Sequence, residues 1–300
     1  ACIGHYQKHA PVSCIQFPET GRELTYGTYP PIDKKKRILV AGGGPGGMKA
    51  ASVAAARGHQ VILCEASGQL GGQALLAQQL PTGEEFGGIV TNLQREMELA
   101  GVEVRRNTRV DRKLVDKERP DAIVIATGGG PVRADTDATE GAHVMTAEDV
   151  INGKVEIGKR VVIADSRRDW IGIGVAEKLA AAGPWGRLVV NGIQPGEFAP
   201  TYVRDASMGR LYKAGVEVTS YARFYGADAD TAYFTHITAR EPIIFEDMDT
   251  LVTCFGSASD RSLELELASS PIETHLIGDC LTPRTAEEAV LEGLKVAVKL

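Results

Sequence analysis

The chain has 300 residues, a formal net charge of −6, 43% hydrophobic and 6% aromatic residues, and 34 glycines. The length and the hydrophobic content are typical of a soluble protein of about two domains. The high glycine and low aromatic content favour α/β nucleotide folds over β-sandwiches. The negative net charge argues against binding to nucleic acid or to an anionic membrane through bulk electrostatics. No apolar run reaches the roughly 18 residues that a membrane span requires. The five cysteines are widely spaced and form no CxxC pair, which argues against a secreted disulfide framework and predicts a cytoplasmic protein. The first residue is Ala rather than Met, so we expect a piece of a longer polypeptide.

Residues 1–36 show little apolar periodicity and predict a connecting arm. Buried strands and helices then alternate, as in a dinucleotide-binding βαβ fold. In this first cycle, strands are expected at 38–41, 61–64, 102–104 and 122–126, and helices at 48–57 and 84–100. A second cycle predicts strands at 160–165, 188–190, 216–218 and 251–254 and helices at 172–182 and 208–214. Two further strands are expected within 232–249, followed by a strand at 275–279 and a helix at 285–300.

A glycine-rich turn joins the first strand to the first helix. It runs Gly42-Gly43-Gly44-Pro45-Gly46-Gly47. Glu65 directly follows the second strand and lies about 20 residues after Gly42, as in dinucleotide-binding folds. Gly42 permits the tight turn, Gly44 lets backbone N–H groups approach a pyrophosphate, and Gly47 lets the helix pack close to the sheet. Glu65 accepts from ribose hydroxyls and disfavours a 2′-phosphate, so FAD, NAD and ADP are the candidate ligands. The alternative is a purely structural turn beside a solvated Glu65.

Three more segments are expected around the same ligand. They are Ala66 with Gly71-Gly72-Gln73 after the second strand, Ala126-Thr127-Gly128 after a central strand, and Gly278-Asp279 at the end of the last strand. Asp279 suits the ribityl chain of a flavin, and the N-terminal amides of the following helix suit its pyrimidine edge. The alternative for Asp279 is an ordinary helix cap. Taken together, the segments favour a flavin.

These motifs resemble the C-terminal half of the old-yellow-enzyme-like NADH:flavin oxidoreductases, the family of trimethylamine dehydrogenase, 2,4-dienoyl-CoA reductase and N-methylproline demethylase. The resemblance rests on the Gly42 loop, Glu65 and Gly71-Gly72-Gln73, on HLIGDCLTPRTAEEA at 275–289, and on ACIG, PVSC and PETGRE near the start. It implies an electron-transfer portion that binds FAD or ADP, joined by a [4Fe-4S] cluster to an FMN-bearing barrel. The barrel carries out the substrate chemistry and is not in this chain, so neither the catalytic residues nor the substrate can be assigned.

The cluster motif departs from the family pattern. The family has four cysteines that begin with CxxC, whereas this chain has Cys2, His5 in place of the second cysteine, and Cys14. Cys2 and Cys14 are the remaining candidate ligands, with His5 as a third, although iron–sulfur clusters favour four thiolates. The alternative is that both cysteines only pack an interdomain arm.

The turn after the strand at 160–165 lacks the clustered glycines of a nicotinamide-binding loop. It consists of Ser166-Arg167-Arg168-Asp169, whose side chains obstruct the approach of a pyrophosphate. Asp169 also carries a negative charge, as the pyrophosphate does. We therefore expect NAD(P) binding to be impaired or lost there. The resemblance to trimethylamine dehydrogenase then implies that electrons leave to a partner such as an electron-transfer flavoprotein. The spacing of the cysteines excludes thiol catalysis and predicts core positions for Cys64 and Cys280.

The predicted fold class is α/β, with two Rossmann-like dinucleotide-binding domains and the second inserted into the first. The expected parts are an arm at 1–36, a FAD- or ADP-binding domain at 37–145 plus 255–300, and an NAD(P)-binding-like domain at 146–254. The predicted function is electron transfer between barrel-bound FMN and an external donor or acceptor, in amine demethylation or enoyl reduction. Two alternatives stay open: an NAD(P)H–flavin reductase acting alone, and a redox-inactive scaffold that holds ADP.

Overall fold

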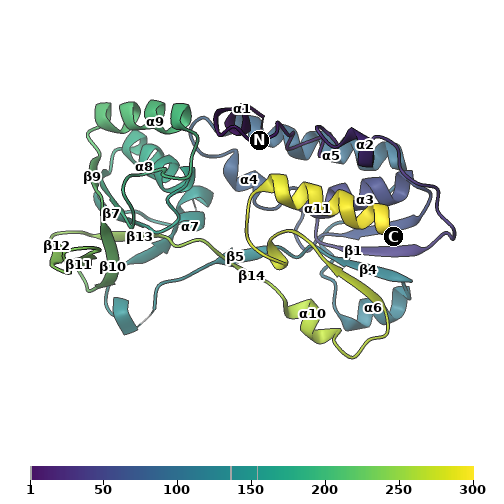
Figure 1. The fold of residues 1–300 in the computed structure, drawn as a ribbon. Coiled ribbons are helices and arrows are strands. Elements are labelled where there is room, and N and C mark those ends of the chain that lie inside the picture. The colour runs from purple at the N-terminus through teal and green to yellow at the C-terminus, as the bar shows by residue number, and fades with distance from the viewer. Residues whose placement is uncertain (1, 136, 154) are drawn as a thin grey trace. The chain divides into compact units, whose positions relative to one another are not determined.

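The computed structural model describes residues 2–135, 137–153 and 155–300, and the chain divides into two compact units. Unit 1 contains the residues up to Leu75, Glu85–Gly130 and Ser257–Leu300, and unit 2 contains Leu76–Glu84 and Pro131–Gly256. Figure 1 shows both units with the chain coloured from its beginning to its end. The strands β5 (Gly129–Pro131) and β14 (Ser257–Ser259) pair where the chain leaves unit 1 and where it returns.

Unit 1 is built on a five-stranded sheet in the order β15-β4-β1-β2-β3. Its strands, all paired in parallel, are β1 (Arg37–Ala41), β2 (Gln60–Cys64), β3 (Glu103–Arg105), β4 (Ala122–Ile125) and β15 (Glu273–Leu276). Ala41 is level with Cys64 on one side and with Ile125 on the other. The segments that follow β1, β2 and β4 therefore start at one edge of the sheet. The strand order reverses at β1, which is where open α/β sheets bind ligands.

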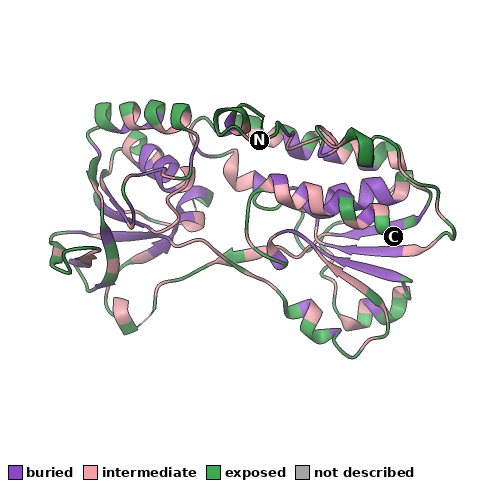
Figure 2. Ribbon diagram, viewed as in Figure 1, coloured by how far each residue is buried: buried purple, intermediate pink, exposed green. Residues whose placement is uncertain are grey.

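Helices cover both faces of this sheet (Figure 1). The helices α3 (Pro45–Ala56), α5 (Gly87–Ala100) and α11 (Ala286–Lys299) pack on one face around Met48, Leu93 and Leu294. The shorter helices α6 (Arg112–Glu118) and α10 (Ser262–Glu266) contribute Val115 and Leu263 to the core on the other face. Figure 2 shows the result, with the central strands β1, β2 and β4 mostly buried and the outer faces of the helices exposed. The remaining short elements are α1 (Cys2–Gln7), α2 (Glu23–Tyr26), α4 (Ala74–Ala77), η1 (Glu84–Phe86) and η3 (Gly278–Cys280).

Unit 2 repeats the pattern with a five-stranded parallel sheet in the order β6-β13-β7-β8-β9. Its strands are β6 (Val144–Thr146), β7 (Arg160–Asp165), β8 (Trp185–Val190), β9 (Glu217–Thr219) and β13 (Thr250–Cys254). Its helical elements are η2 (Asp137–Thr139), α7 (Ala147–Asn152), α8 (Trp170–Ala182) and α9 (Thr201–Lys213). A small antiparallel sheet consists of β10 (Ala222–Ala227), β11 (Ala232–His236) and β12 (Pro242–Phe245).

The parallel sheets with their helices confirm the α/β prediction of Rossmann-like folds. The compact units put residues 131–145 with unit 2, whereas the sequence interpretation put them in the first domain. The reason is the pairing of Val144 with Leu251, which attaches β6 to the sheet of unit 2. Among the described residues, no helix has both the length and the apolar character needed to cross a membrane.

Several elements differ from the sequence expectation because their apolar pattern is weak. The helix α9 begins at Thr201, well before the expected start at residue 208, and buries only Ser207 and Leu211. The helix α6 buries only Val115. Helices that expose most of their surface carry little periodic signal in the sequence.

Candidate functional site

The glycine loop of unit 1 runs from β1 to the first turn of α3. Gly42 has φ +113°, and a Cβ there would lie less than 3.0 Å from the Ala126 carbonyl oxygen. A Cβ on Gly47 would come equally close to the Gly42 carbonyl oxygen. These two glycines are therefore required by the protein's own backbone. Gly44 differs, because no atom lies within 4 Å of its Cβ position, so its glycine leaves open space at the N-terminus of α3, the end of a helix that attracts phosphate.

The Glu65 carboxylate lies beside this loop, directly after β2. Its Oε2 accepts from the Gly43 N–H at 2.8 Å, and its Oε1 accepts from the Ser67 N–H at 2.7 Å. A carboxylate accepts about four hydrogen bonds. Glu65 is thus held in place by two backbone donors and keeps capacity for the hydroxyls of a ribose.

The segment Gly71-Gly72-Gln73 reaches the same loop. The Gly71 N–H donates to the Gly43 carbonyl at 2.8 Å, and a Cβ on Gly72 would lie 3.2 Å from the Gly44 Cα. Gly71 and Gly72 both have positive φ values, +125° and +52°, which favour glycine. The expected approach of this segment to the first glycine loop is present.

Gln73 links the predicted position Asp279 to the segment that follows β4. Its Nε2 donates to the Asp279 Oδ2 at 3.2 Å and to the Gly129 carbonyl at 3.3 Å. The other Asp279 carboxyl oxygen accepts from the Arg284 N–H at 3.2 Å, and the Asp279 carbonyl accepts from Ser259 Oγ at 2.7 Å. The carboxyl group of Asp279 is therefore fixed from two sides at the end of β15.

The cap of α11 is Thr285, which forms a capping box with Glu288. Asp279 is not this N-cap, but its Oδ1 accepts from the N–H of Arg284, the residue before Thr285, which agrees with the alternative of a helix-approach cap. The element η3 and a loop separate Asp279 from α11, and the first turn of α11 carries Glu287 and Glu288. These carboxylates already complement the positive end of the helix dipole.

The Ala126-Thr127-Gly128 segment follows β4 and borders the glycine loop. Thr127 Oγ1 donates to the Asp260 carbonyl at 2.8 Å, so its side chain serves the protein's own structure. Gly128 has φ +78°, and no atom lies within 4 Å of its Cβ position. The backbone at Gly128 is therefore open in the same way as at Gly44. The predicted positions Gly42 to Gly47, Glu65, Ala66, Gly72, Gln73, Ala126, Thr127, Gly128, Gly278 and Asp279 all belong to unit 1.

Sequence reasoning missed the packing of α11 that positions the loop. A Cβ on Gly293 would lie less than 3.0 Å from the Gly46 carbonyl oxygen, and a Cβ on Gly46 would lie 2.9 Å from the Ala289 carbonyl oxygen. The signal was available, because Ala289, Gly293 and Ala297 repeat a small residue every helical turn. It also missed Ser259 and Arg284, whose bonds to Asp279 carry no local motif.

The open positions at Gly44 and Gly128 and the fixed carboxylates of Glu65 and Asp279 fit a bound adenine nucleotide and a flavin. The cysteines near this site lie in the protein core. Cys64 and Cys280 are buried, and burial raises the pKa of each thiol above its ordinary value. Both are core residues, as expected.

The N-terminal arm does not fit an iron–sulfur cluster. Cys2 is exposed and Cys14 is half-buried, and the Cys2 N–H donates to the Ser13 carbonyl at 2.9 Å. His5 Nε2 lies 3.2 Å from Glu287 Oε2, and Ser13 Oγ also donates to Glu287. Within the part of the chain that the structure describes, no three His, Cys, Asp or Glu residues are grouped so that they could hold a metal ion. Among the residues that the structure describes, Cys2 and Cys14 are thus not joined by the further ligands that a cluster requires.

In unit 2, the turn after β7 is closed by the chain's own carboxylates. Asp165 Oδ1 accepts from the Arg167 and Arg168 N–H groups at 2.8 and 3.0 Å. Asp169 Oδ1 accepts from the Ile171 N–H at 2.9 Å and caps α8. These acceptors take the backbone donors that a pyrophosphate requires. Burial raises the pKa of Asp165 to about 7.

Residues 36–293 match the family model of the pyridine nucleotide-disulphide oxidoreductases. The N,N-dimethylglycine/sarcosine dehydrogenase of Chromohalobacter salexigens is 37% identical over 98% of this chain and 49% of its own length. The bilirubin reductase of Mediterraneibacter gnavus is 33% identical over 99% of this chain and 45% of its own length. A histamine dehydrogenase from Rhizobium sp. 4-9 has the same fold, with a TM-score of 0.92 at 22% identity over 99% of this chain and 49% of that one.

The chain therefore spans about half the length of the curated relatives it matches. The matched family and the names of these relatives confirm the resemblance that was expected from the glycine loop and the C-terminal segment.

Proposed function

Because the chain belongs to the pyridine nucleotide-disulphide oxidoreductase family, we propose that it is the electron-transfer portion of a larger flavin-dependent oxidoreductase. The observation that carries this proposal is the convergence in unit 1 of the open glycine loop, Glu65 and the Gln73–Asp279 pair. These groups supply a phosphate site, a ribose acceptor and a third polar site on adjoining segments.

The cofactor proposed for unit 1 is FAD. The Gly42–Gly47 loop would hold the pyrophosphate, Glu65 the ribose hydroxyls, and Asp279 the flavin side chain. When bound, a flavin supplies a carrier that accepts and releases electrons one or two at a time. ADP would use only the loop and Glu65. FAD would also use Asp279, whose carboxyl group is held in place by Gln73 and Arg284. This support for a third polar site favours FAD over ADP.

We propose that electrons enter from an FMN-bearing barrel in the part of the protein outside this chain. They then leave to an external acceptor such as an electron-transfer flavoprotein. The closed turn of unit 2 supports this direction, because Asp165 and Asp169 hold the donors that NAD(P)H would need. The similarity to N,N-dimethylglycine/sarcosine dehydrogenase favours oxidation of an N-methylated amine over reduction of an alkene.

The test is to purify the chain, denature it and identify the released ligand by absorbance and mass spectrometry. Released FAD supports the proposal. Released ADP with no flavin absorbance supports the redox-inactive scaffold and contradicts the FAD assignment. Bleaching of the flavin by NADH or NADPH supports the reductase that acts alone and contradicts the proposed direction of electron flow. Iron at four atoms per chain, a value typical of [4Fe-4S] clusters, would contradict the account of the N-terminal arm.

A further inference from the structure

Cys2 and Cys14 are two free thiols in the N-terminal arm of unit 1, and the proposed electron transfer does not use them. Cys2 is exposed and Cys14 is half-buried, whereas Cys64, Cys254 and Cys280 are buried. Within the described residues, no third His, Cys, Asp or Glu joins Cys2 and Cys14 in a group that could hold a metal ion. The two thiols are therefore open to chemistry that needs only a pair of cysteines.

A backbone hydrogen bond places Cys2 beside Cys14. The Cys2 N–H donates at 2.9 Å to the Ser13 carbonyl, which belongs to the peptide group that joins Ser13 to Cys14. In a trans peptide the carbonyl oxygen and the next Cα lie on the same side, so this bond keeps the two cysteine Cα atoms within roughly 7 Å of each other. Disulfides form at Cα separations of about 4.4–6.8 Å. The two backbones therefore need little or no movement to allow an S–S bond.

Glu287 holds both of the segments that carry these cysteines. It is buried in the first turn of α11. His5 Nε2, three residues after Cys2, lies 3.2 Å from Glu287 Oε2, and Ser13 Oγ, directly before Cys14, donates to Glu287 Oε1. Ser13 Oγ also lies 3.2 Å from His5 Nδ1. Because one carboxylate fixes each segment close to its cysteine, the thiols have a higher effective concentration in the folded chain than in an unfolded loop of the same length.

The exposure of the two thiols is unequal. An exposed cysteine beside a second, resolving cysteine is the arrangement of reversible redox-sensing sites. Cys2 is the thiol that a reagent in solution reaches more easily, and Cys14 is the neighbour that can resolve the product.

We propose that Cys2 and Cys14 are a site of reversible oxidation, at which a low-molecular-weight disulfide such as glutathione disulfide converts the two thiols to one intrachain disulfide. The thiolate of Cys2 attacks one sulfur of glutathione disulfide, and one glutathione thiolate leaves. The thiolate of Cys14 then attacks the Cys2 sulfur of the mixed disulfide, and the second glutathione thiolate leaves. The protein loses two electrons and two protons, and glutathione disulfide takes them up to give two molecules of glutathione. Excess glutathione reverses both steps.

This proposal goes beyond electron transfer through a flavin. It concerns the arm of unit 1 alone and does not depend on which cofactor the glycine loop holds.

The test is to incubate the reduced, purified chain with glutathione disulfide, block the remaining thiols with N-ethylmaleimide, and analyse tryptic peptides by mass spectrometry. Trypsin cleaves after Lys8 and Arg22, so the disulfide would join the peptide that ends at Lys8 to the peptide 9–22. We expect these linked peptides, with a mass lower by two hydrogen atoms than the two peptides with free thiols. Dithiothreitol should separate them.

The extent of linkage in glutathione redox buffers measures how well the fold brings the thiols together. The equilibrium constant for the intrachain disulfide should be larger in the folded chain than in the same chain in concentrated urea, by about tenfold or more. The unfolded chain keeps the same loop length, so the difference reports the contribution of the folded arm.

Two variants make the same chemical change at different cysteines. Cys14→Ala should abolish the linked peptides and leave glutathione attached to Cys2. Cys254→Ala removes a buried thiol of unit 2 and should leave the linked peptides unchanged. If Cys254→Ala fails to fold, the comparison of the unmodified chain with Cys14→Ala decides.

Four outcomes overturn the proposal. The first is glutathione on both cysteines with no linked peptides, and the second is an equilibrium constant no larger in the folded chain than in urea. The third is a disulfide that joins two chains, seen as a dimer on a non-reducing gel. The fourth is bound iron in the purified chain that protects Cys2 and Cys14 from N-ethylmaleimide.

Discussion

The close packing of α11 on α3 can be tested by adding one methyl group. A Cβ on Gly293 would lie less than 3.0 Å from the Gly46 carbonyl oxygen and 3.0 Å from the Ala50 nitrogen. Both are backbone atoms of α3, so they cannot move aside as a flexible side chain would. Overpacking costs about 1–3 kcal/mol, against a gain of about 1 kcal/mol when Ala replaces Gly in a helix. Because the clash is with backbone atoms, the overpacking cost should lie at the upper end of that range. Gly293→Ala should therefore lower the free energy of unfolding of unit 1 by about 1–2 kcal/mol.

The matched control is Gly209→Ala in α9. No atom lies within 4 Å of the Cβ position of Gly209, so the same substitution meets no steric cost. The helix gains about 0.5–1 kcal/mol. The two variants make the same chemical change and should shift stability in opposite directions.

The assay is urea unfolding followed by circular dichroism and by tryptophan fluorescence. Both tryptophans, Trp170 and Trp185, belong to unit 2, so fluorescence reports unit 2 while circular dichroism reports both units. Gly293→Ala should move the transition of unit 1 to lower urea and reduce cofactor retention, because α3 carries the glycine loop. If Gly293→Ala is as stable as the unmodified chain, or more stable, the packing argument is wrong.

Three further predictions concern other parts of the molecule. The pKa of Asp165 is about 7 against an ordinary value of 3.8, so the folded chain binds more protons than the unfolded chain between these values. Unit 2 should therefore lose stability as the pH rises from about 4 to 7. The Asp165→Asn variant keeps an acceptor for the Arg167 and Arg168 N–H groups and should flatten this pH dependence in thermal melts followed by fluorescence. A flat pH profile for the unmodified chain would contradict the raised pKa of Asp165. Asp279→Ala should reduce the amount of FAD that stays bound to the purified chain, and an unchanged FAD content by mass spectrometry would show that Asp279 does not hold the cofactor. Lys49 is buried and pairs with Glu96 at 2.7 Å, so Lys49→Met should destabilise unit 1 by about 1–2 kcal/mol in urea. The double variant with Glu96→Leu should recover most of that loss, and an equally unstable double variant would contradict the ion-pair explanation.

The parts of the site that could be predicted are those where the local backbone conformation or the position in the chain requires a particular residue type. Gly42 and Gly47 leave no room for a side chain, and Glu65 directly follows a buried strand. Such requirements act between neighbours in the chain, so a motif records them. The supports of Asp279 could not be predicted in this way. Gln73 and Ser259 come from distant segments and reach Asp279 only because β2, β14 and β15 bring them together.

The same distinction explains the boundary between the two units. The apolar run at 122–126 was sufficient to predict a strand, but the short strand β6 has little pattern of its own. Its membership of unit 2 follows from its pairing with β13, more than 100 residues later in the chain, since Val144 is level with Leu251.

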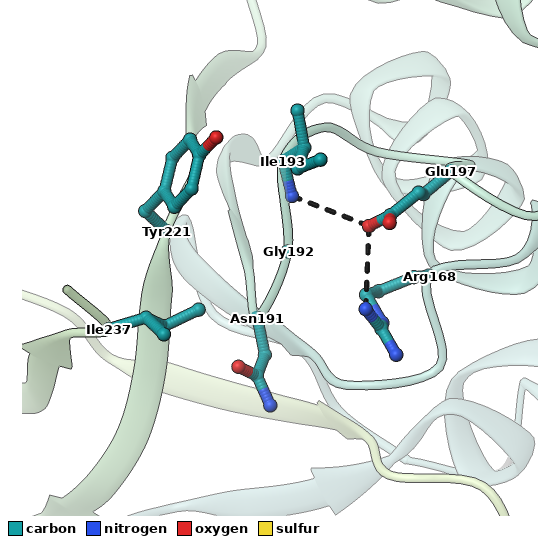
Figure 3. A pocket seen from close by; sticks show the side chains of 7 residues that line it. All are labelled: Arg168, Asn191, Gly192, Ile193, Glu197, Tyr221 and Ile237. Carbon is teal, nitrogen blue, oxygen red and sulfur yellow. Dashed lines mark hydrogen bonds and ion pairs between the residues drawn. The ribbon is translucent and has the colours of Figure 1, made fainter.

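The sequence by itself determined the alternation of strands and helices, the glycine loop and its acidic partner, because periodicity and backbone freedom depend on residue type. It also indicated that the turn at residues 166–169 departs from a nicotinamide-binding loop. Only the tertiary structure decided how that turn is closed, with Asp165 folded back onto the Arg167 and Arg168 N–H groups. Only the tertiary structure brought Arg168, Asn191 and Tyr221 to one pocket of unit 2 (Figure 3). Contacts of this kind join residues that are far apart in the chain, and no local pattern records them.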